Sequence, residues 1–400
     1  MADFQIGPWP VGIDMVSEVT DLPKGAVVDA LNGVFVKGGA FVTRPGELQV
    51  VMGGVFTSTW QSNDGTYYAM EGASFGTVDF ATTPPSFTPI ATLKESMPVS
   101  YADLNGDVII ANNQSLYRYT NGTVIPLGVE PTGAFSTLPV ANGGMDPGTY
   151  GVAISFFNSS GEEGPLSQVE FVTVPAGGGI QFNLPTPLES ATAGIRIYRT
   201  EANGEQLYQV AVLPFFPTTY LIGGDARMGK IADTQYKIRM LGGQYLSVWQ
   251  GRLLVARGRT LYISDPMRYG LCDPRHGFVQ MPYKIVFIGT FPTGIFIGTT
   301  TGVYFLAGSS PDDFQLQLVD EDAPMGGACM SVNVERFQKK ESLFPQGTDY
   351  VQAWLGSGGF HFGLPSGAIV RPQNDRIDLD MTGTYGTLQM IGDVLTAIVY

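Results

Sequence analysis

The stretch Gly106–Thr120 reads GDVIIANNQSLYRYT, and its pattern decides the fold class. An apolar run, DVIIA, is followed by the polar turn NNQS and then by a second run that opens with the pair Leu116-Tyr117. Apolar runs of about four to eight residues on either side of a polar turn are typical of β-hairpins. The stretch therefore predicts an antiparallel pair of strands joined by a short loop.

The same pattern returns along the chain. It is clear in GRLLVARGRTLYISD at 251–265 and in GIFIGTTTGVYFLAG at 294–308, and weaker copies occupy 65–80 and 350–367. A last apolar strand is expected near 394–400. Hairpins at intervals of roughly 40 to 50 residues are typical of propeller blades. We therefore expect an all-β protein, a β-propeller of about five or six blades.

Composition supports this fold class. The 400 residues include 52 Gly and 27 Pro, and only 14% are charged, which is typical of many short strands joined by tight turns. No long stretch has a helical period, so we expect at most a turn or two of helix, at Lys24–Asn32 behind Pro23.

The hairpin pattern is interrupted between Gly133 and Asp225. This region holds strand-like segments such as GTYGVAISFFN, IQFNLP and GIRIYRT, and roughly seven short strands in roughly 90 residues fit a small β-sandwich. Its Gly- and Pro-rich flanks, LGVEPTGAFSTLP and GGDARMGKIAD, indicate linkers. We expect an N-terminal segment and the first blades in 1–130, an inserted fibronectin- or immunoglobulin-like sandwich in 131–225, and the remaining blades with a closing strand in 226–400.

The charge balance bears on possible partners. There are 22 Lys and Arg against 36 Asp and Glu, a formal net charge of -14, and the basic residues are scattered. Phosphate-backbone binding requires clustered cations, so high-affinity nucleic-acid binding is disfavoured. An acidic surface would instead suit a passage through which DNA slides without sticking.

The segment DLNGD offers a candidate metal site. Asp103, Asn105 and Asp107 stand at alternate positions, as do the oxygen ligands of a calcium loop. However, Gly106 follows Asn105 directly, and Gln114 stands where a bidentate glutamate belongs. Because Asn-Gly is a common hairpin-turn dipeptide, a turn is favoured over a calcium site.

The remaining candidates have simple structural interpretations. Solvated loop charge is favoured for the acidic residues around FQLQLV, which are Asp312, Asp313, Asp320, Glu321 and Asp322. For His276 and His361, the only two histidines, packing or a hydrogen bond is favoured over catalysis.

Two further features bear on ligand binding. Ser62–Thr66 is a degenerate copy of the Asp-box turn, and the abundant Tyr and Phe fit core pairs better than a sugar-binding platform. We expect no catalytic, cofactor-binding or metal-binding residues, no cofactor and no enzymatic activity.

Cysteines and the N-terminus give weaker indications. Cys272 and Cys329 are too few for a disulfide framework, so free buried thiols are expected. The opening MADFQIGPWPVG has no basic region before an apolar run, and no window approaches 18 uninterrupted apolar residues. We therefore expect a soluble protein without a classical export signal and without a membrane span.

Three stretches together resemble a known group of proteins. The run Gly12–Gly46 resembles the opening of bacteriophage virion proteins of the tail-nozzle and tail-hub type, which include proteins like tail tubular protein B and packaged-DNA stabilisation proteins. YGVAISFFNSSGEEGPLS with Ile195–Thr200 is similar to their fibronectin-type insertion, and LYISDPMRYG with the run that ends at Phe314 is similar to their blades. The N-terminal pattern is carried by Gly12, Leu22, Pro23, Gly25, Ala26, Ala30, Asn32, Arg44 and Gly46.

The resemblance implies assembly rather than chemistry. It implies a structural protein of the virion tail, assembled in the host cytoplasm, that forms a ring, a hexamer, below the portal and adaptor. Its expected partners are further copies of the chain, portal-adaptor proteins, tail fibres or spikes, and genomic DNA that passes through the ring during ejection. A receptor-binding or carbohydrate-binding propeller of the virion is the alternative.

Overall fold

The computed structural model consists of two compact units. One comprises Met1–Val55, Asp79–Phe87 and Met281–Tyr400, and the other Phe56–Val78 and Thr88–Gln280. The structure describes residues 12–13, 17–18, 20–24, 26–27, 33–35, 41–43, 56–82, 85–94, 99–337, 344–357, 359–371, 385–391 and 394–399. Among these residues the regular elements are strands and two short 3-10 turns, Pro311–Asp313 and Val334–Arg336. The all-β prediction is confirmed.

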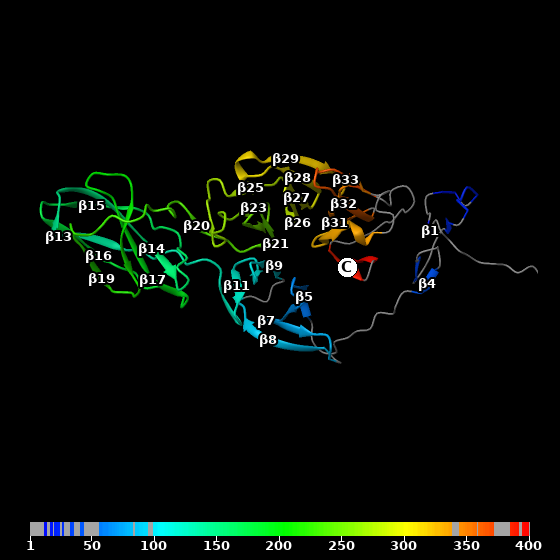
Figure 1. Cartoon of the computed structure of the whole chain (residues 1–400), viewed down its shortest axis with the longest axis horizontal. Helices are drawn as coiled ribbons and strands as arrows, with labels where there is room; N and C mark the ends of the chain where they lie inside the picture. Colours follow the sequence, from blue (N-terminus) through cyan, green and yellow to red (C-terminus); the bar gives the residue numbers. More distant parts are fainter. Residues whose placement is uncertain are drawn as a thin grey trace, which may run out of the picture. The chain divides into compact units, whose positions relative to one another are not determined.

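The described residues form six four-stranded antiparallel sheets (Figure 1), and in five of them the strands are neighbours in the order of the sequence or nearly so. Three of them contain β5 (Phe56–Gln61), β6 (Tyr67–Glu71), β7 (Ser74–Asp79) and β8 (Ser86–Thr92); β9 (Ser100–Leu104), β10 (Asp107–Ala111), β11 (Leu116–Thr120) and β12 (Thr123–Pro126); and β21 (Gln244–Trp249), β22 (Arg252–Arg257), β23 (Thr260–Ile263) and β25 (Phe278–Gln280).

The other two sheets lie in the first unit. They contain β26 (Ile285–Phe291), β27 (Gly294–Thr299), β28 (Gly302–Ala307) and β29 (Gln315–Asp320); and β30 (Cys329–Asn333), β31 (Tyr350–Gly356), β32 (Gly359–Gly363) and β33 (Ile369–Val370). A pair, β34 (Gly386–Ile391) with β35 (Val394–Val399), follows. All five predicted hairpins form the second and third strands of these sheets, and β35 is the predicted last strand.

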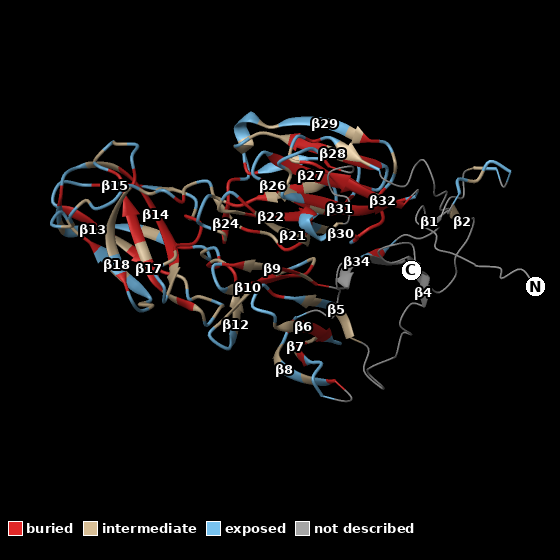
Figure 2. Ribbon diagram, turned by 45° about the vertical axis from the view of Figure 1, so that its right-hand side comes forward, coloured by how far each residue is buried: buried red, intermediate tan, exposed pale blue. Residues whose placement is uncertain are grey.

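The middle strands are apolar because both of their faces are buried. In β10, Val108 and Ile110 pack with Tyr68 and Phe75, which belong to the preceding sheet. Ile109 lies on the opposite face and packs in the cluster that contains Leu253 and Val255 of β22. Strands covered on both faces read as continuous apolar runs rather than alternating ones, which explains DVIIA. Figure 2 shows such strands as largely buried, for example β27 and β31.

The region between β12 and β21 folds differently. A three-stranded sheet contains β13 (Ser136–Met145), β16 (Gly178–Asn183) and β19 (Thr219–Ile222), and a four-stranded sheet contains β15 (Glu170–Val174), β14 (Gly148–Asn158), β17 (Thr192–Arg199) and β18 (Tyr208–Leu213). Side chains of both sheets, such as Ile180, Phe182, Ile154 and Ile197, share one hydrophobic core. This segment thus has the seven strands expected from its sequence.

Polar contacts hold both flanks of this region. Glu130 is buried and accepts hydrogen bonds from the backbone amide of Glu189 (2.8 Å) and the hydroxyl of Thr192 (2.7 Å). On the other flank, Lys230 pairs with Glu163 (2.8 Å). Beyond this flank, Arg239 pairs with Glu189 (2.6 Å) and donates to the carbonyl of Leu127 (3.1 Å). Hydrogen bonds and ion pairs therefore hold both flanks in place. The glycine and proline content of the flanks does not reveal these contacts.

Short pairs complete the described structure. They are β1 (Gly12–Ile13) with β2 (Ala26–Val27), β3 (Gly33–Phe35) with β4 (Phe41–Thr43), and β20 (Ile238–Arg239) with β24 (Leu271–Cys272). The helical turn predicted over Lys24–Asn32 is wrong at Ala26–Val27, which pair in parallel with Gly12–Ile13. The strand pairing outweighs the weak local signal given by Pro23.

Candidate functional site

The DLNGD segment is a hairpin turn, as predicted. Asn105 (φ 53°) and Gly106 (φ 87°) both have positive φ, the conformation of the tight turn that joins β9 to β10. Asp103 accepts hydrogen bonds from Ser62 and Asn63, whereas Asp107 pairs with Arg118 on β11. The carboxylates therefore serve separate partners. Within the described residues, no group of three or more His, Cys, Asp or Glu side chains could hold a metal ion.

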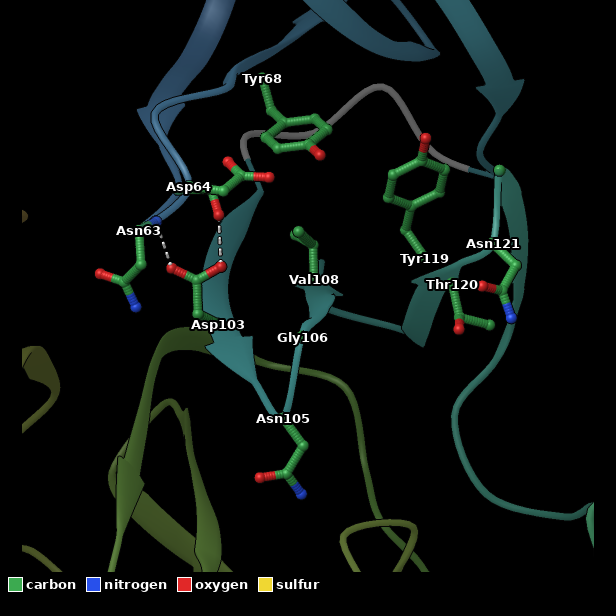
Figure 3. A pocket seen from close by; sticks show the side chains of 12 residues that line it. Asn63, Asp64, Tyr68, Asp103, Asn105, Gly106, Val108, Tyr119, Thr120 and Asn121 are labelled. Carbon is green, nitrogen blue, oxygen red and sulfur yellow. Dashed lines mark hydrogen bonds between the residues drawn. The ribbon is translucent and has the colours of Figure 1, made fainter.

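A polar pocket of about 500 Å³ opens beside this turn (Figure 3). Its rim comes from three turns: Ser62–Asp64 between β5 and β6, Asn105–Gly106 between β9 and β10, and Asn121–Gly122 between β11 and β12. The remaining lining residues are Tyr68, Asp103, Val108, Tyr119 and Thr120. Oxygen and amide groups line the pocket together with two tyrosines, and its lining includes no Lys, Arg or His.

Hydrogen bonds fix the acidic side of the pocket. The Ser62 hydroxyl donates to Asp103 Oδ1 (2.6 Å), and the Asn63 amide donates to Asp103 Oδ2 (2.8 Å). Asp64 Oδ1 accepts from the backbone amide of Thr66 (2.8 Å), and hydrogen bonds from Thr66 lower the pKa of Asp64. Both carboxylates are therefore held in place, and each keeps lone pairs for further donors.

The two tyrosines of the pocket belong to an aromatic cluster. Tyr68 stacks on Phe75 with ring centroids 5.4 Å apart and meets Tyr119 edge-on at 5.9 Å. Tyr68 is only 5% exposed, so its ring is mainly a core side chain, as the sequence interpretation favoured. Tyr119 is half-buried and supplies the more accessible aromatic surface of the pocket.

A second polar cluster surrounds His361 in the first unit. His361 Nδ1 lies 2.7 Å from Asp320 Oδ2, and His361 Nε2 lies 3.4 Å from Asp322 Oδ2. Arg371 also pairs with Asp320, and Asp322 accepts from the Ser357 hydroxyl (2.6 Å). Burial alone would raise the pKa of Asp320, but the bonds to His361 and the Asp322 amide and the charge of Arg371 lower it.

These contacts correct part of the sequence interpretation. Solvated loop charge is wrong for Asp320, whose side chain is fully buried, because basic partners far along the chain converge on it. It is right for Asp312 and Glu321, which are exposed, whereas Asp313 accepts from the amide of Ser310 (2.7 Å). The hydrogen bond expected of a histidine is confirmed for His361, and His276 is exposed.

A third cluster, centred on Glu163, was not anticipated. This buried carboxylate accepts from Ser155 (2.6 Å), Tyr198 (2.5 Å), Arg196 (2.5 Å) and Lys230 (2.8 Å). Burial would raise the pKa of Glu163, but these donors, Lys230 first, lower it. In the sequence, Glu163 is indistinguishable from its neighbour in the loop GEEG, so only the fold reveals it.

The remaining predicted residues lie in several places. Of the N-terminal pattern, Gly12 pairs with Ala26 across β1 and β2, and the Pro23 carbonyl accepts from the Ala26 amide (2.9 Å). Leu22 precedes this turn. Five residues of the pattern lie outside the described residues: Gly25, Ala30, Asn32, Arg44 and Gly46.

Both cysteines are free thiols; Cys272 is buried, as predicted, whereas Cys329 is half-buried. Burial raises the pKa of Cys272 to about 11 and that of Cys329 to about 12, so neither is an activated thiolate at neutral pH. No helix of the described residues has the length and apolar character needed to cross a membrane.

Comparison with known proteins finds no matching protein family and no matching curated protein. Among solved structures, apo AztD from Citrobacter koseri is similar over 86% of this chain and 89% of that chain, with 12% identity and a TM-score of 0.30. Kluyveromyces lactis Hsv2 is similar over 86% and 90%, with 8% identity and a TM-score of 0.31. BBS1N in complex with ARL6DN is similar over 88% and 91%, with 12% identity and a TM-score of 0.32. TM-scores this low carry no argument about this chain.

Proposed function

We propose that the chain is a structural protein of a bacteriophage tail, a nozzle or hub subunit. Copies of it form a ring that extends the DNA channel below the portal and adaptor, retains the genome and then conducts it. The observation that carries the proposal is the order of parts along the chain. The N-terminal pattern of 12–46 precedes consecutive four-stranded sheets, and a separate two-sheet segment, β13 to β19, interrupts them.

The finer fold proposed is a propeller with an inserted sandwich. Its support is the way successive sheets pack inside each unit. The backbone amide of Tyr245, in β21, donates to the Ser100 hydroxyl of β9 (2.9 Å), although more than 100 residues separate them in sequence. The sheets before and after the two-sheet segment are thus packing neighbours, as blades on either side of an insertion would be.

Packing in the first unit supports the same proposal. Phe287 and Phe296 of the β26–β29 sheet pack on Trp354 of the next sheet, with ring centroids 5.5 and 5.4 Å apart. Leu388 and Leu395 of the β34–β35 pair pack on the cluster that contains Val351 and Phe362. Stacking of consecutive meander sheets through their faces is the arrangement of propeller blades. Five such sheets and the β34–β35 pair agree with about five or six blades.

Rigid attachment of the two-sheet segment also fits a ring subunit. Besides the Glu130 and Arg239 anchors, Lys237 pairs with Asp265 (3.1 Å) and Asp273 (3.2 Å) next to this segment. A domain that is fixed to its neighbours presents a constant surface to the next subunit, and closed rings require such repeated geometry. The net charge of -14 is compatible with a channel that DNA does not adhere to.

Electron microscopy of the purified chain, alone and with a portal-adaptor complex, tests this function. The expected result is a ring with a central opening that docks on the adaptor. Single, separate particles at every concentration, with no binding to portal-adaptor proteins, would overturn it.

A second candidate function is carbohydrate binding at the virion surface, which the pocket of Figure 3 favours. Fixed carboxylates, amides and an accessible tyrosine are the groups that recognise sugar hydroxyls and stack on a sugar ring. A glycan array tests this candidate with the wild type and Asn121→Ala, since Asn121 lies on the exposed rim. Binding that the substitution abolishes would support it, and an array without any signal would remove it.

A further inference from the structure

In each of the five four-stranded sheets outside the β13–β19 segment, the last strand along the sequence is an edge strand, and β29 differs from the other four such strands. β8 contains Pro89, β12 ends at Pro126, β25 has three residues and β33 has two. Proline and short length are common ways to keep a sheet edge from pairing with another chain. β29 has six residues, QLQLVD, and no proline. Among these five edges, it alone combines this length with the absence of proline, and Gln315–Leu318 pair with β28 in regular register before the register shifts at Val319.

β29 is also exposed and uncharged over most of its length. Leu316 is 41% exposed and Leu318 is 45% exposed, and Gln315 and Gln317 are exposed as well. Figure 2 shows this strand pale blue at the edge of its sheet, opposite the side that pairs with β28. The stretch Gln315–Val319 carries no charged side chain, and in a chain with a net charge of -14 such a stretch of a sheet edge is a place where two copies can approach each other.

Both ends of β29 are held in place. At the start, Asp313 accepts from the amides of Ser309 (3.1 Å) and Ser310 (2.7 Å). At the end, the buried Asp320 is bound by His361 and Arg371. The strand is therefore held extended before any partner arrives, which reduces the entropy lost on pairing.

We propose that β29 is a self-association strand, through which two copies of the chain pair edge to edge in antiparallel register. Its sequence is self-complementary about Gln317. With Gln317 on the twofold axis, it faces its own equivalent, and Leu316 of each copy faces Leu318 of the other. Opposite residues of an antiparallel pair share one face, so four leucines gather on one side of the joined sheet. This contact is twofold, and it is separate from the ring contacts of the proposed function.

Cysteine cross-linking of the full chain tests the proposal directly. In Gln317→Cys, the new thiols lie opposite each other across the twofold axis, so mild oxidation should give a covalent dimer. Leu221→Cys, on the outer strand β19, is the matched control, because Leu221 is 52% exposed and Gln317 is exposed as well. Faster cross-linking of Gln317→Cys is expected. Equal rates in the two variants would overturn the proposal.

Sedimentation of the unmodified chain adds an equilibrium measurement. In Leu318→Lys each of the two copies brings one positive charge to the contact, so the self-association constant should fall roughly 10- to 100-fold. Leu221→Lys should leave this constant unchanged. Identical association of wild type and Leu318→Lys would show that another surface, or another protein's strand, is the partner, and would refute the proposal. If the chain forms rings but Gln317→Cys does not cross-link, only this inference is refuted. If Gln317→Cys cross-links but the chain forms no rings, only the proposed function is refuted.

Discussion

Replacement of Glu163 by alanine should loosen the two-sheet segment strongly. The substitution removes the acceptor of the buried Tyr198 hydroxyl, and it leaves the guanidinium of Arg196, whose side chain is 15% exposed, with the Gly161 carbonyl (3.1 Å) as its remaining acceptor. Removing one partner of a buried pair typically costs about 3–5 kcal/mol. Lys230 is 46% exposed, so the loss of its contact adds at most about 1 kcal/mol.

Glu163→Gln separates charge from hydrogen bonding. The amide oxygen still accepts from Tyr198 and Ser155, but the bonds lose the assistance of the negative charge, which we expect to cost about 1–2 kcal/mol. Glu205→Ala is the control. Glu205 is exposed, and its removal should change the free energy of unfolding by no more than about 0.5 kcal/mol.

Hydrogen exchange is the suitable assay, because a chain with two compact units need not unfold in one step. Amides of β14 and β17, the strands that carry Ser155, Arg196 and Tyr198, should exchange faster in the order wild type, Glu163→Gln, Glu163→Ala. Amides of β31 in the other unit should not change. Unaltered exchange of β14 and β17 in Glu163→Ala would refute the reasoning.

Three further predictions concern other parts of the chain. The pKa of Asp320 is lowered on folding, so its ion pairs stabilise the protein above the unfolded pKa of about 3.9. This contribution is lost as the pH falls through the lower folded pKa. Urea titrations should therefore show that Asp320→Asn is less stable than the wild type at pH 7 and that the difference in the free energy of unfolding shrinks in acid. Gly106→Ala should lower the free energy of unfolding by about 1–2 kcal/mol through its φ of 87° alone, since no atom lies within 4 Å of the added methyl group, and a thermal melt with no change would contradict this. Cys272 and Cys329 should resist alkylation by iodoacetamide at pH 8 in the native protein and react after unfolding. The mass of the intact protein counts the alkylated thiols. Rapid labelling of the native protein would contradict the raised pKa values of the two thiols.

Much of the fold could be predicted from the sequence because hairpins are local. The segments DVIIA and LYRYT are the two strands of one hairpin and are separated only by its turn. The dipeptide Asn105-Gly106 predicts the positive φ angles of the turn before it. The outer strands were harder to recognise. β29, for example, has four exposed residues in succession, and its place beside β28 depends on the loop that Asp313 closes.

The polar clusters could not be predicted, because their members lie far apart in sequence. Asp320 meets His361 across 41 residues, and Glu163 meets Lys230 across 67. The pocket is likewise formed by turns from three hairpins. The sequence pattern indicated two of them, Ser62–Thr66 and DLNGD, but as separate features. The contact between Ser62 and Asp103 joins these two segments, and no spacing rule connects them.

The mass of the particle that the purified chain forms tests the central claim most directly. The mass is measured on the wild type and on Leu318→Lys, in which pairing through β29 is weakened. We expect the variant to form a closed assembly of six chains of 42.9 kDa each. A single-chain mass at every concentration, with and without the portal-adaptor complex, would contradict the claim that this protein works as a ring.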